Sequence, residues 1–263
     1  MSRSSRRADP SPHDSAWARV QRWRGVILII AALVATAWLA LNNQLILYIH
    51  PRYIVFTVVM AAIALVLVIA SFLLRPGHNH DEPQTRSQAR LSTVASLLAV
   101  GVALAMIVVP PATLTSATVA QRDINSSGVG AEVQSVDDAS DSSDAVFAAF
   151  TVLDWASLLR QTSDTSFYAS KPVDVTGFVT EDSSDPDNVF YVSRFVVTCC
   201  AVDAQPVGVP VYLPGWRDQH AVDDWVEVTG QFATNSSQSS TEQIALMPET
   251  ITPVGEPSEP YLF

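Results

Sequence analysis

The residues of this chain best suited to chemistry are its two cysteines, Cys199 and Cys200, which are adjacent in the sequence. Thiolate sulfur is a soft ligand that favours zinc or cuprous copper. A metal site needs more ligands than two sulfurs. Asp203 lies three residues beyond Cys200, and His220 is the one histidine after Pro111. The pattern therefore predicts a metal site, with zinc as the leading ion, at Cys199, Cys200 and Asp203, and His220 as a weaker candidate ligand.

Two other interpretations of the cysteine pair remain open at this point. The thiols could cycle between dithiol and disulfide, although a bridge between adjacent cysteines closes a strained ring. They could also be packing residues. Because successive strand residues point to opposite faces, both thiols can reach one site only if the strand ends near them. The segment Gln205-Pro206-Val207-Gly208 predicts such a turn just downstream.

A second, weaker metal candidate is the pair His78 and His80 in His78-Asn79-His80-Asp81-Glu82. Two imidazoles beside carboxylates can hold a divalent cation weakly. No scaffold that would preorganise them is visible in the surrounding sequence, so a polar loop with incidental histidines is the favoured interpretation.

Three nearly uncharged apolar runs, 25–41, 53–74 and 91–109, precede the cysteines. Each is close to the ~20 residues that cross a bilayer core as a helix. We therefore predict a transmembrane region over 23–110, with spans of about 25–46, 53–74 and 91–110. The first run could instead be a signal peptide with a weak cleavage site at Ala35-Thr36-Ala37, but the long basic leader and the two further runs favour an uncleaved helix.

Arginine is distributed unevenly around these runs. Six arginines precede the first run and three lie between the second and third, whereas the first loop holds one, Arg52. Positive flanks stay cytoplasmic, so we expect the N-terminus inside a plasma membrane crossed several times and the C-terminal portion outside. After Pro111 the chain has 22 acidic and 5 basic residues, a formal charge of −17. Such a portion is unsuited to nucleic acid, whose phosphates require Lys and Arg.

The rest of the chain divides by composition. Residues 1–22 are predicted to be a disordered basic leader, 111–144 a flexible acidic and serine-rich linker, 145–255 an extracytoplasmic domain, and 256–263 a tail. Within the domain, apolar residues at helical spacing predict a helix over 146–160. Strand patterns follow at 173–180, 189–198, 208–213, 225–233 and 243–254, separated by turn residues, notably 182–188.

Two of these strands resemble each other. Val173-Asp174-Val175-Thr176-Gly177-Phe178 parallels Val226-Glu227-Val228-Thr229-Gly230-Gln231-Phe232. Alternation turns the valines inward, and a glycine lets a strand bend sharply, as small closed barrels require. The predicted fold class is membrane-anchored α + β: three transmembrane helices followed by a small extracytoplasmic β-barrel of oligonucleotide/oligosaccharide-binding (OB) type. A sandwich is the alternative.

Several segments together carry a resemblance to a known family. They are Ile49-His50-Pro51-Arg52, Lys171-Pro172-Val173-Asp174-Val175-Thr176-Gly177-Phe178-Val179, Phe195-Val196-Val197-Thr198-Cys199-Cys200-Ala201-Val202-Asp203-Ala204, Gly208-Val209-Pro210-Val211 and Trp225-Val226-Glu227-Val228-Thr229-Gly230. Over residues 23–255 the chain resembles the YcgQ-like family of bacterial membrane proteins, which are described as permease-associated subunits. The resemblance implies a larger polytopic permease as partner and a link to zinc limitation.

Taken together, these features predict a non-enzymatic accessory subunit of a membrane permease that handles zinc or another metal. The sequence has no Gly-x-Ser-x-Gly nucleophile motif and no phosphate-loop or dinucleotide fingerprint. An extracytoplasmic thiol-redox module and a structural assembly module are the alternatives, and they differ in whether the cysteines cycle or only support folding.

Overall fold

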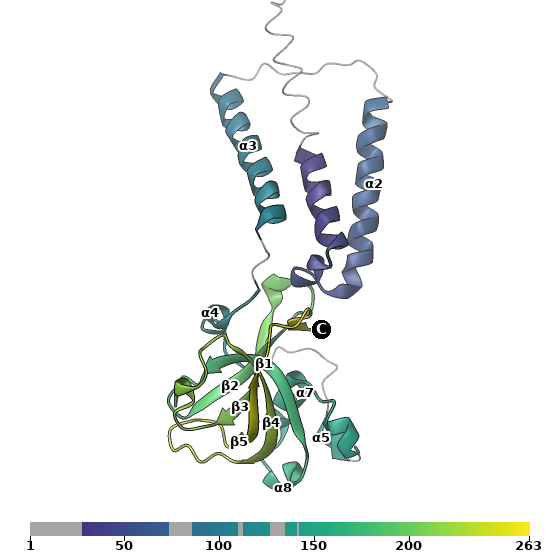
Figure 1. Cartoon of the computed structure of the whole chain (residues 1–263). Coiled ribbons are helices and arrows are strands. Elements are labelled where there is room, and N and C mark those ends of the chain that lie inside the picture. The colour runs from purple at the N-terminus through teal and green to yellow at the C-terminus, as the bar shows by residue number, and fades with distance from the viewer. Residues whose placement is uncertain (1–27, 74–85, 110–112, 127–134, 141) are drawn as a thin grey trace, which may run out of the picture. The chain divides into compact units, whose positions relative to one another are not determined.

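The computed structural model describes residues 28–73, 86–109, 113–126, 135–140 and 142–263 (Figure 1). The chain divides into two units. The helical unit comprises Met1–Leu45 and Pro51–Pro111, and the sheet unit comprises Ile46–His50 and Ala112–Phe263. A short segment that lies between two apolar helices in the sequence therefore belongs to the sheet unit. The predicted leader, 1–22, lies outside the described residues.

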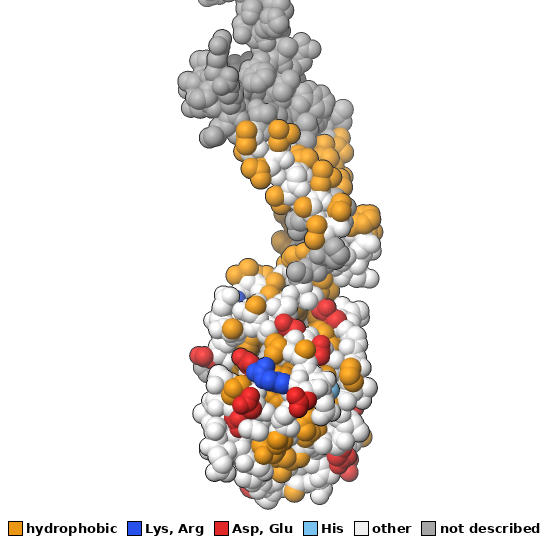
Figure 2. Space-filling view, turned by 60° about the vertical axis from the view of Figure 1, so that its left-hand side comes forward, with side chains coloured by type: hydrophobic (Ala, Val, Ile, Leu, Met, Phe, Trp, Pro, Cys, Tyr) orange, Lys and Arg blue, Asp and Glu red, His pale blue; other side chains and the backbone are white. Residues whose placement is uncertain are grey.

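The helical unit contains an apolar helix at Leu28–Leu41, the 3-10 turn η2 at Pro51–Tyr53, and the helices α2 (Ile54–Leu73) and α3 (Arg86–Val108). Among the described residues, one helix is long and apolar enough to cross a membrane, Pro51–Ser71, judged by length and composition alone. None of its most apolar window is buried, and hydrophobic side chains cover much of the visible helical surface in Figure 2.

The prediction of three membrane spans is therefore wrong for the part of the chain that the structure describes. The first apolar helix stops at Leu41, well short of residue 46, because two asparagines end it. The Asn42 side chain donates to the Trp38 carbonyl at 2.8 Å, and Asn43 adopts a φ of 55°, a conformation that commonly terminates helices. Over its described residues, α3 does not meet the test that Pro51–Ser71 meets.

The sheet unit is built on six strands: β1 (Val173–Glu181), β2 (Val189–Val196), β3 (Gln205–Tyr212), β4 (Trp225–Thr234), β5 (Ile244–Pro253) and β6 (Tyr261–Leu262). Their order is β1-β4-β5-β3-β2-β6, and β1 also pairs with β2. The β3–β5 and β2–β6 pairs are parallel, and the others are antiparallel. The prediction of an OB-like barrel of five strands is corrected to this mixed six-stranded sheet. Its sixth strand comes from the predicted tail, where two residues are too few to show alternation.

The five predicted strands form close to their expected positions, and their two glycines are required by close backbone approach. A Cβ built on Gly177 would lie 2.5 Å from the Ser193 carbonyl oxygen, and one on Gly230 would lie 2.2 Å from the Met247 carbonyl oxygen. The β4–β5 register shifts between Thr229 and Gly230. Both strands therefore need glycine where another backbone passes within contact distance.

The helix predicted over 146–160 is divided in two. α6 covers Asp144–Phe147, and α7 covers Val152–Gln161. Thr151 starts the second helix through a capping box, in which its hydroxyl accepts from the Asp154 N–H while the Asp154 carboxylate accepts from the Thr151 N–H. α7 buries Trp155 completely, with its ring 5.2 Å from that of Phe232 on β4.

Two stretches that composition assigned to the linker contribute to the sheet unit's cores. α4 (Ser116–Val119) buries Val119, and α5 (Val136–Ser140) buries Ala139. The Asn125 side chain holds β3 by donating to the Gly208 carbonyl and accepting from the Gly208 N–H, both at 2.9 Å. A further short helix, α8 (Thr165–Tyr168), precedes β1.

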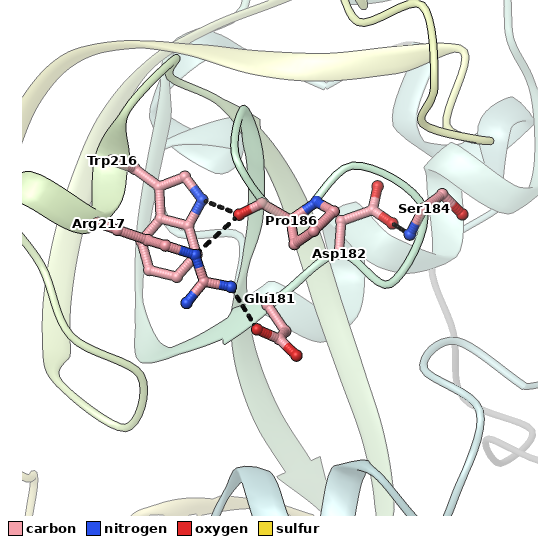
Figure 3. Close-up of polar contacts among 6 residues, drawn as sticks. All are labelled: Glu181, Asp182, Ser184, Pro186, Trp216 and Arg217. Atoms are coloured by element: carbon pink, nitrogen blue, oxygen red, sulfur yellow. Dashed lines mark hydrogen bonds and ion pairs between the residues drawn. The ribbon is translucent and has the colours of Figure 1, made fainter.

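The turn between β1 and β2 is held by the 3-10 helix η4 (Trp216–Asp218), as Figure 3 shows. The Trp216 indole and the Arg217 guanidinium both donate to the Pro186 carbonyl, at 3.0 and 3.1 Å. Arg217 also pairs with Glu181. These contacts hold the turn just before the start of β2, the strand that leads to the cysteines. The turn predicted over 182–188 is confirmed.

Candidate metal centre

Strand β2 ends just before the two cysteines, and its C-terminal end pairs with β6. Phe195 and Val196 pair with Tyr261 and Leu262, and the Val197 N–H donates to the Leu262 carbonyl at 2.9 Å. Phe195 and Val197 are almost fully buried. The cysteine loop, defined here as residues 197–204, therefore starts from a fixed point.

Arg194 fastens the segment that forms β6. Its guanidinium donates to the carbonyls of Pro260, Thr176 and Glu259, at 2.8, 3.3 and 2.6 Å. Burial lowers the pKa of Arg194, and the Glu259 carboxylate acts in the opposite direction. Arginine nevertheless stays protonated in proteins, so the cation remains available to all three carbonyls.

We expect Arg194→Ala to lower the free energy of unfolding by about 2 kcal/mol, because a half-buried cation that donates to three backbone carbonyls is lost. Denaturant titration of the full chain measures this. Arg217→Ala is the matched control. Its ion pair with Glu181 and its bond to the Pro186 carbonyl are both exposed, so their loss is expected to cost less than about 1 kcal/mol. Equal losses in the two variants would contradict the role given to Arg194.

The segment Ile46–His50 pairs with the cysteine loop from far away in the sequence. Ile49 and Cys200 form an antiparallel bridge. The His50 N–H donates to the Cys199 carbonyl at 3.0 Å, and the Ala201 N–H donates to the Tyr48 carbonyl at 2.9 Å. Leu47 packs against the same cluster as Phe195 and Val197. The loop is therefore held by backbone pairing at the cysteines themselves.

Asp203 organises the inside of the cysteine loop. Its carboxylate accepts three backbone N–H groups, from Thr198 at 3.1 Å, Cys199 at 2.8 Å and Cys200 at 3.3 Å. It also ends the 3-10 helix η3 (Ala201–Asp203), whose N-cap is Cys200. Successive N–H groups that converge on one carboxylate make a compact anion-binding turn. The loop thus places this oxygen ligand beside both thiols.

The structure brings the three principal candidates together, as the sequence predicted. One ligand atom each from Cys199, Cys200 and Asp203 lie within 4.8 Å of one another. Cys199 is exposed and Cys200 is half-buried, and neither is in a disulfide. The thiols converge because β2 ends at Val196 and the chain turns directly. The turn predicted at Gln205-Pro206-Val207-Gly208 is wrong, since those residues begin β3.

This arrangement suits a tetrahedral cation. Zinc binds thiolate sulfur at about 2.3 Å and carboxylate oxygen at about 2.0–2.2 Å, so ligand atoms in one tetrahedral shell lie roughly 3–4 Å apart. The three candidate ligand atoms, which lie within 4.8 Å of one another, are close to that spacing. Asp203 keeps lone pairs for a metal, because a carboxylate offers about four acceptor positions. Three protein ligands leave a fourth position open.

The weaker candidates are not joined to this cluster. His220 is buried just after η4, where its backbone N–H donates to the Trp216 carbonyl at 3.0 Å. Its side chain is absent from the cluster formed by Cys199, Cys200 and Asp203. His78 and His80 lie outside the described residues. Within the described ranges, that cluster is the one group of three or more His, Cys, Asp or Glu side chains with metal-binding spacing.

Sequence reasoning missed the partner segment of the loop. In the sequence, Ile49-His50-Pro51-Arg52 contributes only to the family resemblance and gives no sign of a contact with the cysteines. Nothing in periodicity could place Tyr48 and His50 beside residues so distant in the chain. The available signal was weak: a polar histidine flanked by an apolar run and a proline.

Comparison with known proteins gives two matches to family models. Residues 23–125 match the DUF1980 N-terminal domain, and residues 137–263 match the DUF1980 C-terminal domain. Together these matches cover most of the chain, and the second includes the whole cysteine loop. The searches of curated proteins and of solved structures found no match.

Proposed function

We propose that this chain, which belongs to the DUF1980 family, binds zinc at Cys199, Cys200 and Asp203. It serves without catalysis as an accessory subunit of a membrane permease. The observation that carries the proposal is the convergence of the two sulfurs and the carboxylate oxygen within 4.8 Å. That convergence occurs in a loop whose backbone is bonded to Ile46–His50 and whose preceding residue, Val197, is bonded to β6.

The ligand set favours zinc over other ions. Two thiolates and one carboxylate combine soft and hard donors, which suits a borderline cation. Cuprous copper prefers sulfur alone, and calcium and magnesium require shells of oxygen. The exposure of Cys199 leaves the ion accessible to exchange, as expected for a protein that passes metal on.

The charge of the sheet unit supports delivery of a cation. From residue 112 onward the chain has 22 acidic and 5 basic residues, and acidic side chains are spread over the visible face of the sheet unit in Figure 2. A negative surface raises the local concentration of cations and their rate of arrival. The same charge disfavours nucleic acid as a partner.

Attachment to a membrane rests on the apolar helix Pro51–Ser71. The similarity to YcgQ-like proteins supports a polytopic permease as the partner. In this proposal the cysteine loop is the part that presents metal to the permease.

The corresponding test uses cells in which the gene for this chain is deleted and then restored as wild type or as Asp203→Ala. Impaired growth under zinc limitation that only the wild type rescues is expected. Unchanged growth of the deletion strain would contradict the permease role.

A thiol-redox function is the second candidate, because the two cysteines are adjacent and are not joined by a disulfide. A disulfide between Cys199 and Cys200 would reshape the peptide units whose N–H groups bind Asp203. Oxidation would therefore disrupt the loop that the carboxylate organises. Alkylation of intact cells separates the two functions: metal binding requires thiols that stay reduced, whereas redox cycling predicts a change under mild oxidant.

Zinc titration of the full chain in detergent tests the proposal directly. Elemental analysis is expected to find one zinc per chain, and a competing chelator gives the affinity. Asp203→Ala is expected to weaken binding by at least about 100-fold, because a ligand and the organiser of the loop are both lost. Asp218→Ala, at the equivalent end of η4, is the matched control and should bind normally. A wild-type chain without bound zinc would refute the proposed function.

A further inference from the structure

The pairing of Ile46–His50 with the cysteine loop places a histidine next to the thiols. Ile49 opposes Cys200 in the antiparallel bridge, so the next pair in the register is His50 with Cys199. The His50 N–H bond to the Cys199 carbonyl, at 3.0 Å, fixes this register. Residues directly opposite in an antiparallel pair share one face and have Cβ atoms about 4.5–5.5 Å apart. His50 and Cys199 are therefore neighbours beside the bridge, joined by a backbone bond.

We propose that His50 is the fourth protein ligand of the zinc site, completing a Cys199, Cys200, Asp203 and His50 shell. The inference deepens the proposed function and rests on it. Imidazole nitrogen is a common zinc ligand at about 2.0–2.1 Å, and a cross-strand separation of about 5 Å lets one ion bridge the two side chains. The chain then supplies all four positions of a tetrahedral site.

The imidazole has an alternative contact in the structure. Its ring lies edge-on to Phe263, with centroids 5.1 Å apart and planes at 66°, and it is not within the group of ligand atoms that lie within 4.8 Å of one another. Binding therefore requires His50 to turn toward Cys199. Phe263 is 39% exposed, so this ring contact lies at the surface and can be exchanged for a metal bond without opening a core.

A four-ligand site would have a structural consequence. Zinc would cross-link the cysteine loop to Ile46–His50, and the chain continues from His50 directly into η2 and α2. The ion would thus strengthen the pairing that the Ile49–Cys200 bridge begins. A water molecule or a donor from the permease in the fourth position would leave this segment unaffected by zinc.

The test compares zinc affinity and the visible spectrum of bound cobalt(II) for the full chain in detergent. His50→Phe keeps a ring against Phe263 but cannot ligate, and His50→Cys keeps a ligand. Phe263→Leu removes the ring contact without touching any ligand. We expect His50→Phe to bind zinc at least about tenfold more weakly, since even groups that only support a zinc ligand contribute that much. His50→Cys should retain tight binding, and Phe263→Leu should bind like the wild type.

The cobalt spectrum reports the ligands of the bound ion, so replacing His50 changes it only if His50 binds the metal. Intense d–d bands, typical of four-coordinate cobalt(II), are expected for the wild type and should shift in His50→Phe. Unchanged affinity and an unchanged spectrum in His50→Phe, with wild-type binding intact, would overturn the fourth ligand and leave the proposed function standing. Failure of the wild type to bind zinc would overturn both.

Discussion

Replacing Gly230 with alanine is expected to destabilise the sheet unit severely. A Cβ at this position would lie 2.2 Å from the Met247 carbonyl oxygen and 3.1 Å from the Pro248 Cα. Both obstacles are backbone atoms, so relief requires β4 and β5 to separate at their register shift. We expect a loss of more than about 4 kcal/mol, the range reached by severe core disruption, against a total stability of about 5–15 kcal/mol for a typical domain.

Gly255→Ala is the matched control for this prediction. A Cβ there would meet no atom within 4 Å, so its stability should stay within about 0.5 kcal/mol of the wild type. Tryptophan fluorescence of the full chain during denaturant titration reports both variants, because Trp155 and Trp216 are fully buried in the sheet unit. A native unfolding midpoint in Gly230→Ala would show that β4 and β5 can yield at this point.

The double substitution Cys199→Ser/Cys200→Ser is expected to remove specific zinc binding while preserving the fold. Serine is nearly the same size as cysteine but is not a soft ligand, so the site loses both sulfur donors. We expect the affinity to fall by at least about 1,000-fold, a change of about 4 kcal/mol. The loop should keep its shape, because the bonds that hold it come from the backbone N–H groups of Cys199 and Cys200 to Asp203.

Val202→Ser controls for the added hydroxyl, since Val202 is in the same loop, is 82% exposed, and has no part in the ligand cluster. Its zinc affinity should match that of the wild type. Circular dichroism and the unfolding midpoint establish that the double variant is folded. Tight zinc binding by a folded double variant would place the metal elsewhere and contradict the assignment of the thiols.

Local pattern was enough to locate the five long strands and the three side chains of the candidate metal site. Alternating valines mark β1 and β4, and their glycines mark positions where backbones approach closely. The convergence of Cys199, Cys200 and Asp203 followed from two facts available in the sequence: the thiols are adjacent, and a carboxylate lies three residues further on. Only a turn lets all three face one site, and η3 supplies it.

The features that could not be predicted are those that depend on distant contacts. β6 has two residues, too few for alternation, and it exists because Arg194 and β2 hold it. Ile46–His50 lies between apolar stretches in the sequence, yet it joins the sheet unit through backbone bonds to the cysteine loop. Composition alone cannot show that Asn125 fastens β3.

The prediction of the first membrane span failed for a local reason. Hydropathy predicts that the first span continues through Asn42 and Asn43, because apolar residues resume at Leu45. Those asparagines instead end the helix, through the left-handed conformation of Asn43 and the Asn42 bond to Trp38. Hydropathy records how apolar a segment is, but it does not record where a helix is capped.

The central claim, that zinc is held by the adjacent thiols, is tested most directly by zinc K-edge X-ray absorption of the loaded full-length chain. If both thiols bind the ion, the spectrum shows two sulfur scatterers per zinc at about 2.3 Å, together with nitrogen or oxygen ligands at about 2.0–2.2 Å. A shell made only of nitrogen and oxygen would contradict the account, because it would show that Cys199 and Cys200 do not bind the ion.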